Sequence, residues 1–221
     1  MTTATTTPQT TAPIWVSFPA HALPDVDWTD HGAAHRAVMR LFSPHLPGSP
    51  RARRAAGSIL YRIDLQPDNT PVVLVQSQHP VQLLPPAARA LTVPQARWDL
   101  RDGQQVMLRV AVNPLTRRTV KHDNGSRHEA VQILLPDQVP PWLEGKLTPG
   151  VQIRTVLNQV RTTTRTRRGP AAGSTPPQIV VETIDAIGVV TDATQFARMR
   201  REGVGRAKAY GCGLLTAVAA S

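Results

Sequence analysis

Alternating apolar and polar positions in the first half of the chain predict short strands around one helix. Four strands are predicted here, over residues 14–18, 58–63, 71–76 and 90–100. Between the first two strands, residues 30–42 place Ala34, Val38 and Phe42 at helical spacing, and Asp30 can cap this helix. Residues 81–90 are apolar but contain two prolines, so any helix there is short.

The second half of the chain repeats this order of elements. Strands are predicted over residues 104–112, 151–161, 179–190 and 214–219. A helical region broken by prolines is predicted over residues 129–147, and a helix over residues 193–201. Two βαββαβ units in succession predict an α+β fold with two tandem ferredoxin-like domains, as in RNA-recognition modules. The expected divisions are a disordered Thr-rich leader at 1–13 and domains at 14–101 and 102–221.

Composition adds a strong positive charge to this picture. The 221 residues carry a formal net charge of +10, nearly all of the positive charge being arginine. This indicates a polyanionic partner, most often nucleic acid, whereas arginine-rich codon usage is the alternative. The arginines gather in three predicted loops, around residues 51–54, 117–121 and 161–168, which favours nucleic acid. No apolar run is long enough for a membrane helix and the N-terminus lacks a signal-peptide pattern, so a cytoplasmic protein is expected.

The single cysteine, Cys212, excludes an internal disulfide and a cysteine-based zinc site. A thiol nucleophile stays open, although no histidine lies near Cys212 in sequence. Cys212 belongs to a glycine-rich segment, GVGRAKAYGCGLL over residues 203–215. Such glycines let backbone amides approach a phosphate, and Arg206 and Lys208 add positive charge. A plain glycine-rich turn after a helix is the alternative, and neither a dinucleotide-binding motif nor a P-loop fits.

The glycine-rich segment resembles the loop that precedes the last strand in the CasE family of CRISPR repeat endoribonucleases from type I-E Cascade complexes. Three upstream segments resemble that family in the same order. They are HRAVMRLF at 35–42, LRVAVNP at 108–114 and WLEGKL at 142–147. The similarity therefore extends over about residues 14–219, and its most specific part is the glycine-rich loop.

The resemblance implies a cleavage chemistry and a catalytic residue. In the family, a ribose 2′-hydroxyl attacks the adjacent phosphate of the repeat RNA, leaving a 2′,3′-cyclic phosphate and a 5′-hydroxyl without a metal or another cofactor. His35 stands at the position of the family's catalytic histidine, and Arg40 is a candidate phosphate contact. Family members often carry a tyrosine one turn before this histidine, and this chain has Gly32 there. The contribution of the tyrosine to proton transfer or orientation must therefore be absent or come from another residue.

The resemblance also implies contacts with RNA and with other Cascade subunits. A basic hairpin of the second domain grips the RNA stem in the family, and an arginine-rich hairpin is predicted here around residues 161–168. The expected RNA-binding residues are Arg161, Arg165, Arg167, Arg168, Gly203, Gly205, Arg206, Lys208, Gly211 and Gly213. Few aromatic residues are present, so base stacking on a single strand is poorly supported. A catalytically weakened RNA-hairpin-binding subunit and an unrelated structural RNA-binding protein are the alternative functions.

Overall fold

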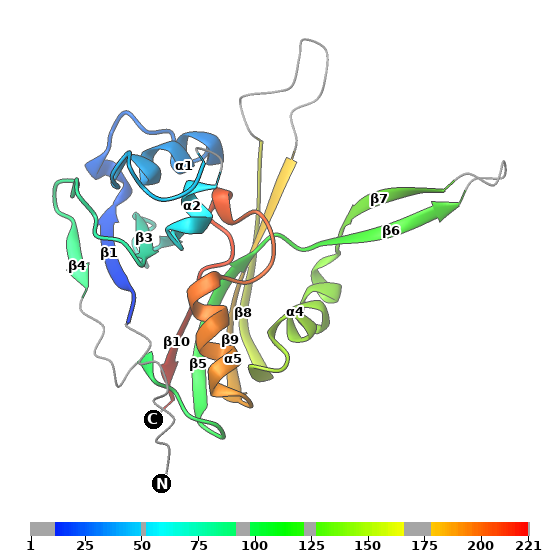
Figure 1. The fold of residues 1–221 in the computed structure, drawn as a ribbon. Helices are drawn as coiled ribbons and strands as arrows, with labels where there is room; N and C mark the ends of the chain where they lie inside the picture. Colours follow the sequence, from blue (N-terminus) through cyan, green and yellow to red (C-terminus); the bar gives the residue numbers. More distant parts are fainter. Residues whose placement is uncertain (1–11, 50–51, 92–97, 122–126, 166–177, 221) are drawn as a thin grey trace, which may run out of the picture.

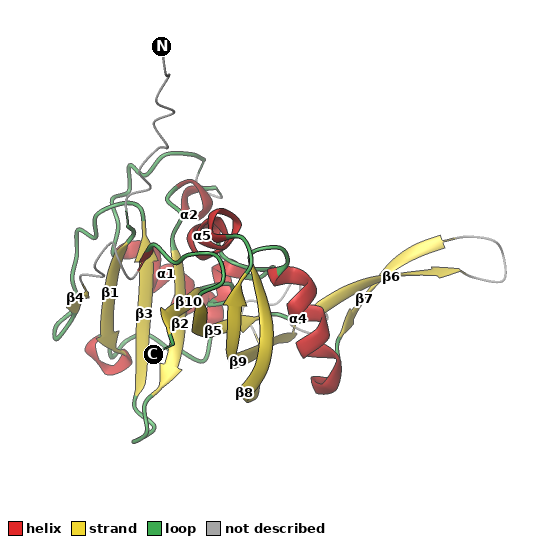
Figure 2. Ribbon diagram, turned by 90° about the horizontal axis from the view of Figure 1, so that it is seen from below, coloured by secondary structure: helices red, strands yellow, loops and turns green. Residues whose placement is uncertain are grey.

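In the described part of the chain, the strands form two four-stranded antiparallel sheets and a two-stranded arm (Figures 1 and 2). The structure is a computed structural model, and it describes residues 12–49, 52–91, 98–121, 127–165 and 178–220. Most of the predicted leader lies outside these residues. No helix of the described part is long and apolar enough to cross a membrane.

The first sheet has the strand order β2-β3-β1-β4. Its strands are β1 (Ile14–Pro19), β2 (Leu60–Leu65), β3 (Pro71–Ser77) and β4 (Arg89–Leu91). Helix α1 (His31–Arg40) follows β1 and packs Ala34 and Val38 against Phe18 and Tyr61 of the sheet, and α2 (Arg53–Ala56) precedes β2. The short helix allowed for residues 81–90 does not form. Of the strand predicted over 90–100, residues 90 and 91 belong to β4, residues 98–100 are not in a strand, and residues 92–97 lie outside the described part.

The second sheet has the order β10-β5-β9-β8. From its other edge it places the second, third, first and fourth of its strands side by side, as the first sheet does. Its strands are β5 (Gln105–Val112), β8 (Val151–Arg165), β9 (Gln178–Val190) and β10 (Leu215–Ala219). Helices α4 (Val139–Leu147) and α5 (Ala193–Glu202) cover one face (Figure 1), where Leu143 and Phe196 join Leu108 and Ile184 in the core. The repeated order confirms the predicted fold of two ferredoxin-like domains. The boundary between residues 101 and 102 stays a prediction.

The prediction of a helical region over residues 129–147 is wrong in its first part. Strands β6 (Leu115–Lys121) and β7 (Arg127–Ile133) pair along their whole length and form an arm that projects from the body (Figures 1 and 2). The helix α4 begins only at Val139, with prolines in its first turn, where the missing N–H groups would have no helical partner. The prolines that were expected to break a helix therefore mark its start.

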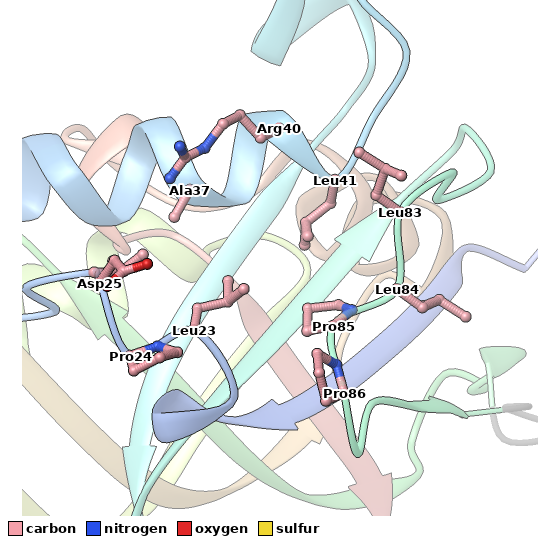
Figure 3. Close-up of a pocket in the computed structure, with 11 residues that line it drawn as sticks. Leu23, Pro24, Asp25, Ala37, Arg40, Leu41, Leu83, Leu84, Pro85 and Pro86 are labelled. Carbon is pink, nitrogen blue, oxygen red and sulfur yellow. The ribbon is translucent and has the colours of Figure 1, made fainter.

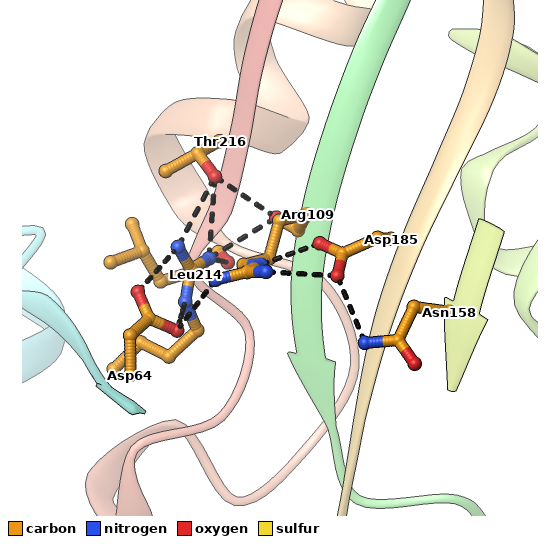
Figure 4. A network of polar contacts seen from close by, with 7 residues as sticks. Asp64, Arg109, Asn158, Asp185, Leu214 and Thr216 are labelled. Atoms are coloured by element: carbon orange, nitrogen blue, oxygen red, sulfur yellow. Dashed lines mark hydrogen bonds and ion pairs between the residues drawn. The ribbon is translucent and has the colours of Figure 1, made fainter. Parts of the chain in front are cut away.

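A polar network joins the two sheets where β2 meets β5 and β10 (Figure 4). Arg62 is nearly buried, pairs with Asp64 at 2.8 Å and donates to the carbonyl oxygen of Leu214 at 3.1 Å. Arg109 pairs with Asp185 on β9 and lies 3.6 Å from Asp64. Through these contacts β2 of the first domain is fixed to the strand that follows the glycine-rich loop of the second.

Candidate active site and nucleic-acid interface

Helix α1 presents two histidines on one side. The Asp30 carboxylate accepts a hydrogen bond from the amide of Gly32 at 2.8 Å and caps the helix, as predicted. His31 and His35 stand one turn apart and therefore share a side of the helix. His35 is half-buried, and its Nδ1 is buried with no hydrogen-bond partner among the described residues.

The surroundings of His35 favour its neutral form. Burial lowers the pKa of His35 below its ordinary value, and the positive charges of Arg54 and Arg36 lower it further. A neutral imidazole can accept a proton near neutral pH, as a general base must. The local chemistry is therefore compatible with the role predicted for His35.

Arg54 of α2 brings a positive charge to this place. Its guanidinium donates to the carbonyl oxygen of Ile59 at 3.0 Å, and it forms no ion pair with a carboxylate in the described part of the chain. Its charge also lowers the pKa of Lys208, after burial as the larger cause. Arg54 thus stands within electrostatic range of both His35 and the glycine-rich loop. The sequence signalled it only as part of the basic run at 51–54.

The glycine-rich loop joins α5 to β10 and turns repeatedly through the left-handed region. Its residues with positive φ are Gly203, Gly205, Ala207, Gly211 and Gly213. Within the described residues, no acceptor is found for the amides of Gly205, Arg206, Ala207 and Lys208. The Lys208 ammonium donates to the carbonyl oxygen of Glu202 at 2.8 Å, and Arg206 is exposed. Free amides beside two cations are suited to an anion such as a phosphate.

The four glycines of the prediction do not share one role. A Cβ on Gly203 would lie 2.8 Å from Leu60 and 2.9 Å from a backbone oxygen, and one on Gly213 would lie 2.9 Å from the Val204 oxygen. A Cβ on Gly211 would lie 3.3 Å from the Tyr61 ring. At Gly205 the nearest atom would be 3.9 Å away. Three glycines are therefore needed for packing, and only Gly205 faces open space.

The loop is held against α1 by the first domain. The short 3-10 helix η3 (Lys208–Tyr210) packs on α1, and the Tyr61 hydroxyl donates to the carbonyl oxygen of Ala209 at 3.0 Å. The ring of Tyr210 lies 6.3 Å from the ring of His31, measured between centroids. Lys208, Tyr210, Arg54 and the two histidines thus surround one place, which we call the α1–loop site.

Arg40 lies away from this site. It is exposed and lines a cavity of about 370 Å³ with Leu23, Leu41 and a run of leucine and proline residues at 83–86 (Figure 3). Five residues along a helix correspond to a rotation of about 140° from His35. The structure does not bring Arg40 together with His35, and a phosphate contact at Arg40 stays a prediction.

The arginines predicted to grip RNA on the β8–β9 hairpin are only partly described. Arg161 forms an ion pair with the buried carboxylate of Glu182 at 2.5 Å and donates to the carbonyl oxygen of Leu134 at 2.9 Å. Its charge is therefore already paired within the protein. Arg165 is the last residue of β8, and Arg167 and Arg168 lie outside the described residues.

A second basic element was not assigned to a strand pair from the sequence. The β6–β7 arm carries Arg117, Arg118, Lys121 and Arg127 on its two strands, and its backbone pairs Lys121 with Arg127. The basic run at 117–121 was the available signal. Projection of the arm from the body makes it a candidate to reach a bound nucleic acid. Among the described residues, no three or more His, Cys, Asp or Glu side chains form a group that could hold a metal ion.

Comparison with known proteins shows both a family and a fold. Residues 14–218 match the model of the family described as CRISPR associated protein. The crystal structure of the CRISPR-associated protein Cas6e from Escherichia coli K-12 is 19% identical with a TM-score of 0.66, covering 94% of this chain and all of that one. A search of curated proteins found no match.

Two further solved structures share the fold. CRISPR endoribonuclease Cse3 bound to a 19-nt RNA is 21% identical with a TM-score of 0.69, covering 93% of this chain and 99% of that one. A chain of a CRISPR RNA-guided surveillance complex is also 21% identical, with a TM-score of 0.59, and covers 93% of this chain and all of that one. At these identities the likeness demonstrates the fold.

Proposed function

This chain belongs to the family of CRISPR associated proteins, and from that membership we propose that it is an endoribonuclease that cleaves precursor CRISPR RNA at the base of the repeat hairpin. The cut follows attack by a ribose 2′-hydroxyl on the neighbouring phosphate. It leaves a 2′,3′-cyclic phosphate and a 5′-hydroxyl. The observation that carries the proposal is His35, which stands on the helix that packs against the glycine-rich loop and within electrostatic range of Arg54, in a chain of this family.

His35 acts in this reaction as the group that removes the proton from the 2′-hydroxyl. Burial and the charge of Arg54 hold its pKa down, so the imidazole is neutral at neutral pH and able to accept that proton. Attack by a nucleophile within the substrate needs no activated water, since proximity is supplied by the ribose itself. For that reason we propose a metal-independent cleavage.

Negative charge grows on the phosphate during attack and must be stabilised. Arg54 and Lys208 supply two cations, and the amides of residues 205–208 supply hydrogen-bond donors at the same place. Donors and cations fixed in position before the reaction stabilise such charge more than mobile water does. The α1–loop site can therefore bind the phosphate to be cut.

The basic arm and the β8–β9 hairpin hold the RNA stem in this proposal. Cationic side chains on projecting hairpins contact phosphates, and such contacts supply most of the affinity for a stem. One similar structure is a chain of a CRISPR RNA-guided surveillance complex. This likeness supports a second part of the proposal, in which the protein keeps the cut RNA and joins other Cascade subunits.

A catalytically weakened RNA-hairpin-binding subunit is the second candidate function. Gly32 favours it, because this position lacks the tyrosine that family members often carry one turn before the histidine. Both candidates predict tight binding of the hairpin. They differ only in whether the bound RNA is cut.

The test is incubation of the purified protein with RNA of the repeat from the CRISPR array in the same genome, in excess EDTA. We expect one cut at the base of the hairpin, with a cyclic phosphate and a 5′-hydroxyl at the new ends. His35→Ala should lose cleavage by about 10²–10⁴-fold while RNA affinity changes by a few-fold at most. Tight binding without cleavage by the unaltered protein would favour the weakened subunit. Cleavage that stops in EDTA would refute metal independence.

A further inference from the structure

The proposed reaction moves two protons, and His35 accounts for one of them. The 2′-hydroxyl must lose a proton as its oxygen attacks phosphorus, and the 5′-oxygen must gain one as it leaves. When the two transfers overlap in time, the imidazole that is accepting the first proton cannot also donate to the 5′-oxygen, which leaves on the opposite side of the phosphorus. A second group at the α1–loop site has to donate, and this inference rests on the proposed function.

Three other proton-bearing groups on α1 or against the glycine-rich loop are poorly suited to donate. His31 is nine-tenths buried, and burial lowers its pKa, so its ring is neutral. The Tyr61 hydroxyl is committed to the carbonyl oxygen of Ala209, and burial raises the pKa of this tyrosine. Cys212 is fully buried, and burial raises its pKa to about 12. Burial therefore also argues against Cys212 as a thiol nucleophile.

Tyr210 differs from these groups in its exposure and its hydrogen bonding. It is half-buried, and its hydroxyl has no hydrogen-bond partner in the described part of the chain. It stands in η3, two residues after Lys208 and next to the free amides of the loop. Its ring is 6.3 Å from that of His31, on the side of α1 that also carries His35.

A shared neighbour ties Tyr210 to the cation of the site. Burial is the main cause of the raised pKa of Tyr61, and Tyr210 raises it further whereas Arg54 lowers it, so Tyr61 is a neighbour of both. Tyr210 and His31 also line one cavity of about 330 Å³ between the two sheets. Both ring nitrogens of His31 are buried there without a partner among the described residues. Polar atoms without described partners are therefore found both in the loop, as the amides of residues 205–208, and in this cavity, as the His31 nitrogens.

We propose that Tyr210 is the general acid of the cleavage, held by the glycine-rich loop against the helix that carries His35. His35 takes the proton of the 2′-hydroxyl as the O2′–P bond forms. Tyr210 gives its phenolic proton to the 5′-oxygen as the P–O5′ bond breaks. The products are the cyclic phosphate and a free 5′-hydroxyl, and a proton passes from the histidine to the phenolate through water to restore the site.

Lys208 is the competing donor at the same place. Its ammonium is already held by the carbonyl oxygen of Glu202 at 2.8 Å, and its fixed charge is what a phosphate requires. We therefore assign charge stabilisation to Lys208 and proton donation to Tyr210. An RNA whose leaving group needs no proton separates the two roles. It should restore cleavage when the proton donor is missing, but not when the charge-stabilising residue is missing.

The experiment uses the full chain and two synthetic repeat RNAs, one normal and one with sulfur in place of the 5′-oxygen at the cut. A thiolate leaves without protonation because thiols are much stronger acids than alcohols. Tyr210→Phe should cut normal RNA about 10²-fold more slowly than the unaltered protein, and the sulfur RNA within about threefold of it. His35→Ala and Lys208→Met should stay slow on both RNAs.

Each other outcome decides against the inference. If Tyr210→Phe cuts the normal RNA at the normal rate, the inference is overturned. It is also overturned if the sulfur RNA restores the cleavage rate of Lys208→Met but not that of Tyr210→Phe. An equal loss by Tyr210→Phe on both RNAs would make Tyr210 a positioning residue. Its Tm should stay within about 2 °C of the unaltered protein, because the hydroxyl that is removed has no described partner. Failure of the unaltered protein to cut either RNA would instead refute the proposed function, and this inference with it.

Discussion

The hydroxyl of Tyr61 on β2 donates to the carbonyl oxygen of Ala209, 148 positions later in the chain, at 3.0 Å. One residue belongs to the first sheet and the other to the glycine-rich loop of the second domain. The bond ties the loop to the sheet on which α1 packs. It therefore joins the two halves of the α1–loop site.

Removing this bond should affect cleavage more than folding. Tyr61→Phe keeps the buried ring and deletes one hydrogen bond, so the free energy of unfolding should fall by about 1 kcal/mol. The loop is then less firmly placed, and the single-turnover cleavage rate should fall at least tenfold. Urea denaturation and rapid-quench cleavage measure the two effects. A rate loss no larger than the loss of folded protein would show that the bond only stabilises the fold.

The pH dependence of cleavage should report the charge of Arg54. A histidine base works only when neutral, so the rate rises with pH through its pKa and then levels. Arg54 lowers the pKa of His35, so the plateau extends to lower pH in the unaltered protein. In Arg54→Met the pKa should rise, and the acidic limb of the rate profile should move to higher pH.

Arg36 is the matched control for this experiment. It also lowers the pKa of His35, but as the smaller of the two charge effects and from an exposed position on α1. Arg36→Met should therefore move the acidic limb in the same direction and by less, since solvent and salt screen its charge. An unmoved limb in Arg54→Met would separate Arg54 from His35.

Two glycines of the loop should respond differently to an added side chain. Gly205 faces open space at a positive φ, so Gly205→Val meets backbone strain of about 1–2 kcal/mol and should lower the Tm by about 2–8 °C. We expect it to abolish RNA binding, because the side chain covers the free amides. Filter binding at a temperature where the variant is folded measures this loss.

Gly203→Ala is the comparison. Its smaller side chain would press on Leu60 and on the carbonyl oxygen of Gly213, so it should lower the Tm more than Gly205→Val does. Normal RNA binding by folded Gly205→Val would remove the phosphate contact from this loop.

The salt dependence of RNA affinity should show which hairpin of the protein binds the RNA stem. Replacing Arg117, Arg118 and Lys121 of the arm with glutamine should weaken binding and flatten the slope of log affinity against log salt, by about 0.9 for each phosphate that the protein no longer neutralises. The matched variant replaces Arg165, Arg167 and Arg168 of the β8–β9 hairpin. The hairpin whose replacement leaves both slope and affinity unchanged does not bind the stem.

The sequence predicted best those elements that bury one face. Strands β1, β3 and β5 and helices α1 and α5 follow the predicted ranges to within about two residues, because their apolar positions point into a core. The β6–β7 arm was missed because it projects and pairs only with itself, so Arg127–Ile133 shows no core-facing pattern. Pattern alone could not separate it from the helix that follows.

The sequence could identify site residues that belong to one continuous motif, but not the contacts between distant segments. His35 and the glycine-rich loop could be found because each lies in a continuous motif. Tyr210 stands within the glycine-rich segment, but nothing in sequence shows that its ring reaches His31, 179 positions earlier. Arg54 likewise needed the fold to bring it to Lys208. Arg161 was predicted to face RNA, and its pairing with Glu182 depends on the register of β8 and β9.

The ion-pair network between the sheets has a consequence for how the molecule unfolds. If the first domain opened alone, Arg109 would lose Asp64, and the carbonyl oxygen of Leu214 would lose Arg62. Stranding such groups costs each domain part of its own stability. The two domains should therefore melt as one cooperative unit with a single transition. A destabilising mutation in either sheet, even far from the α1–loop site, would then lower the fraction of molecules that are folded. It would not unfold one domain while the other stays intact.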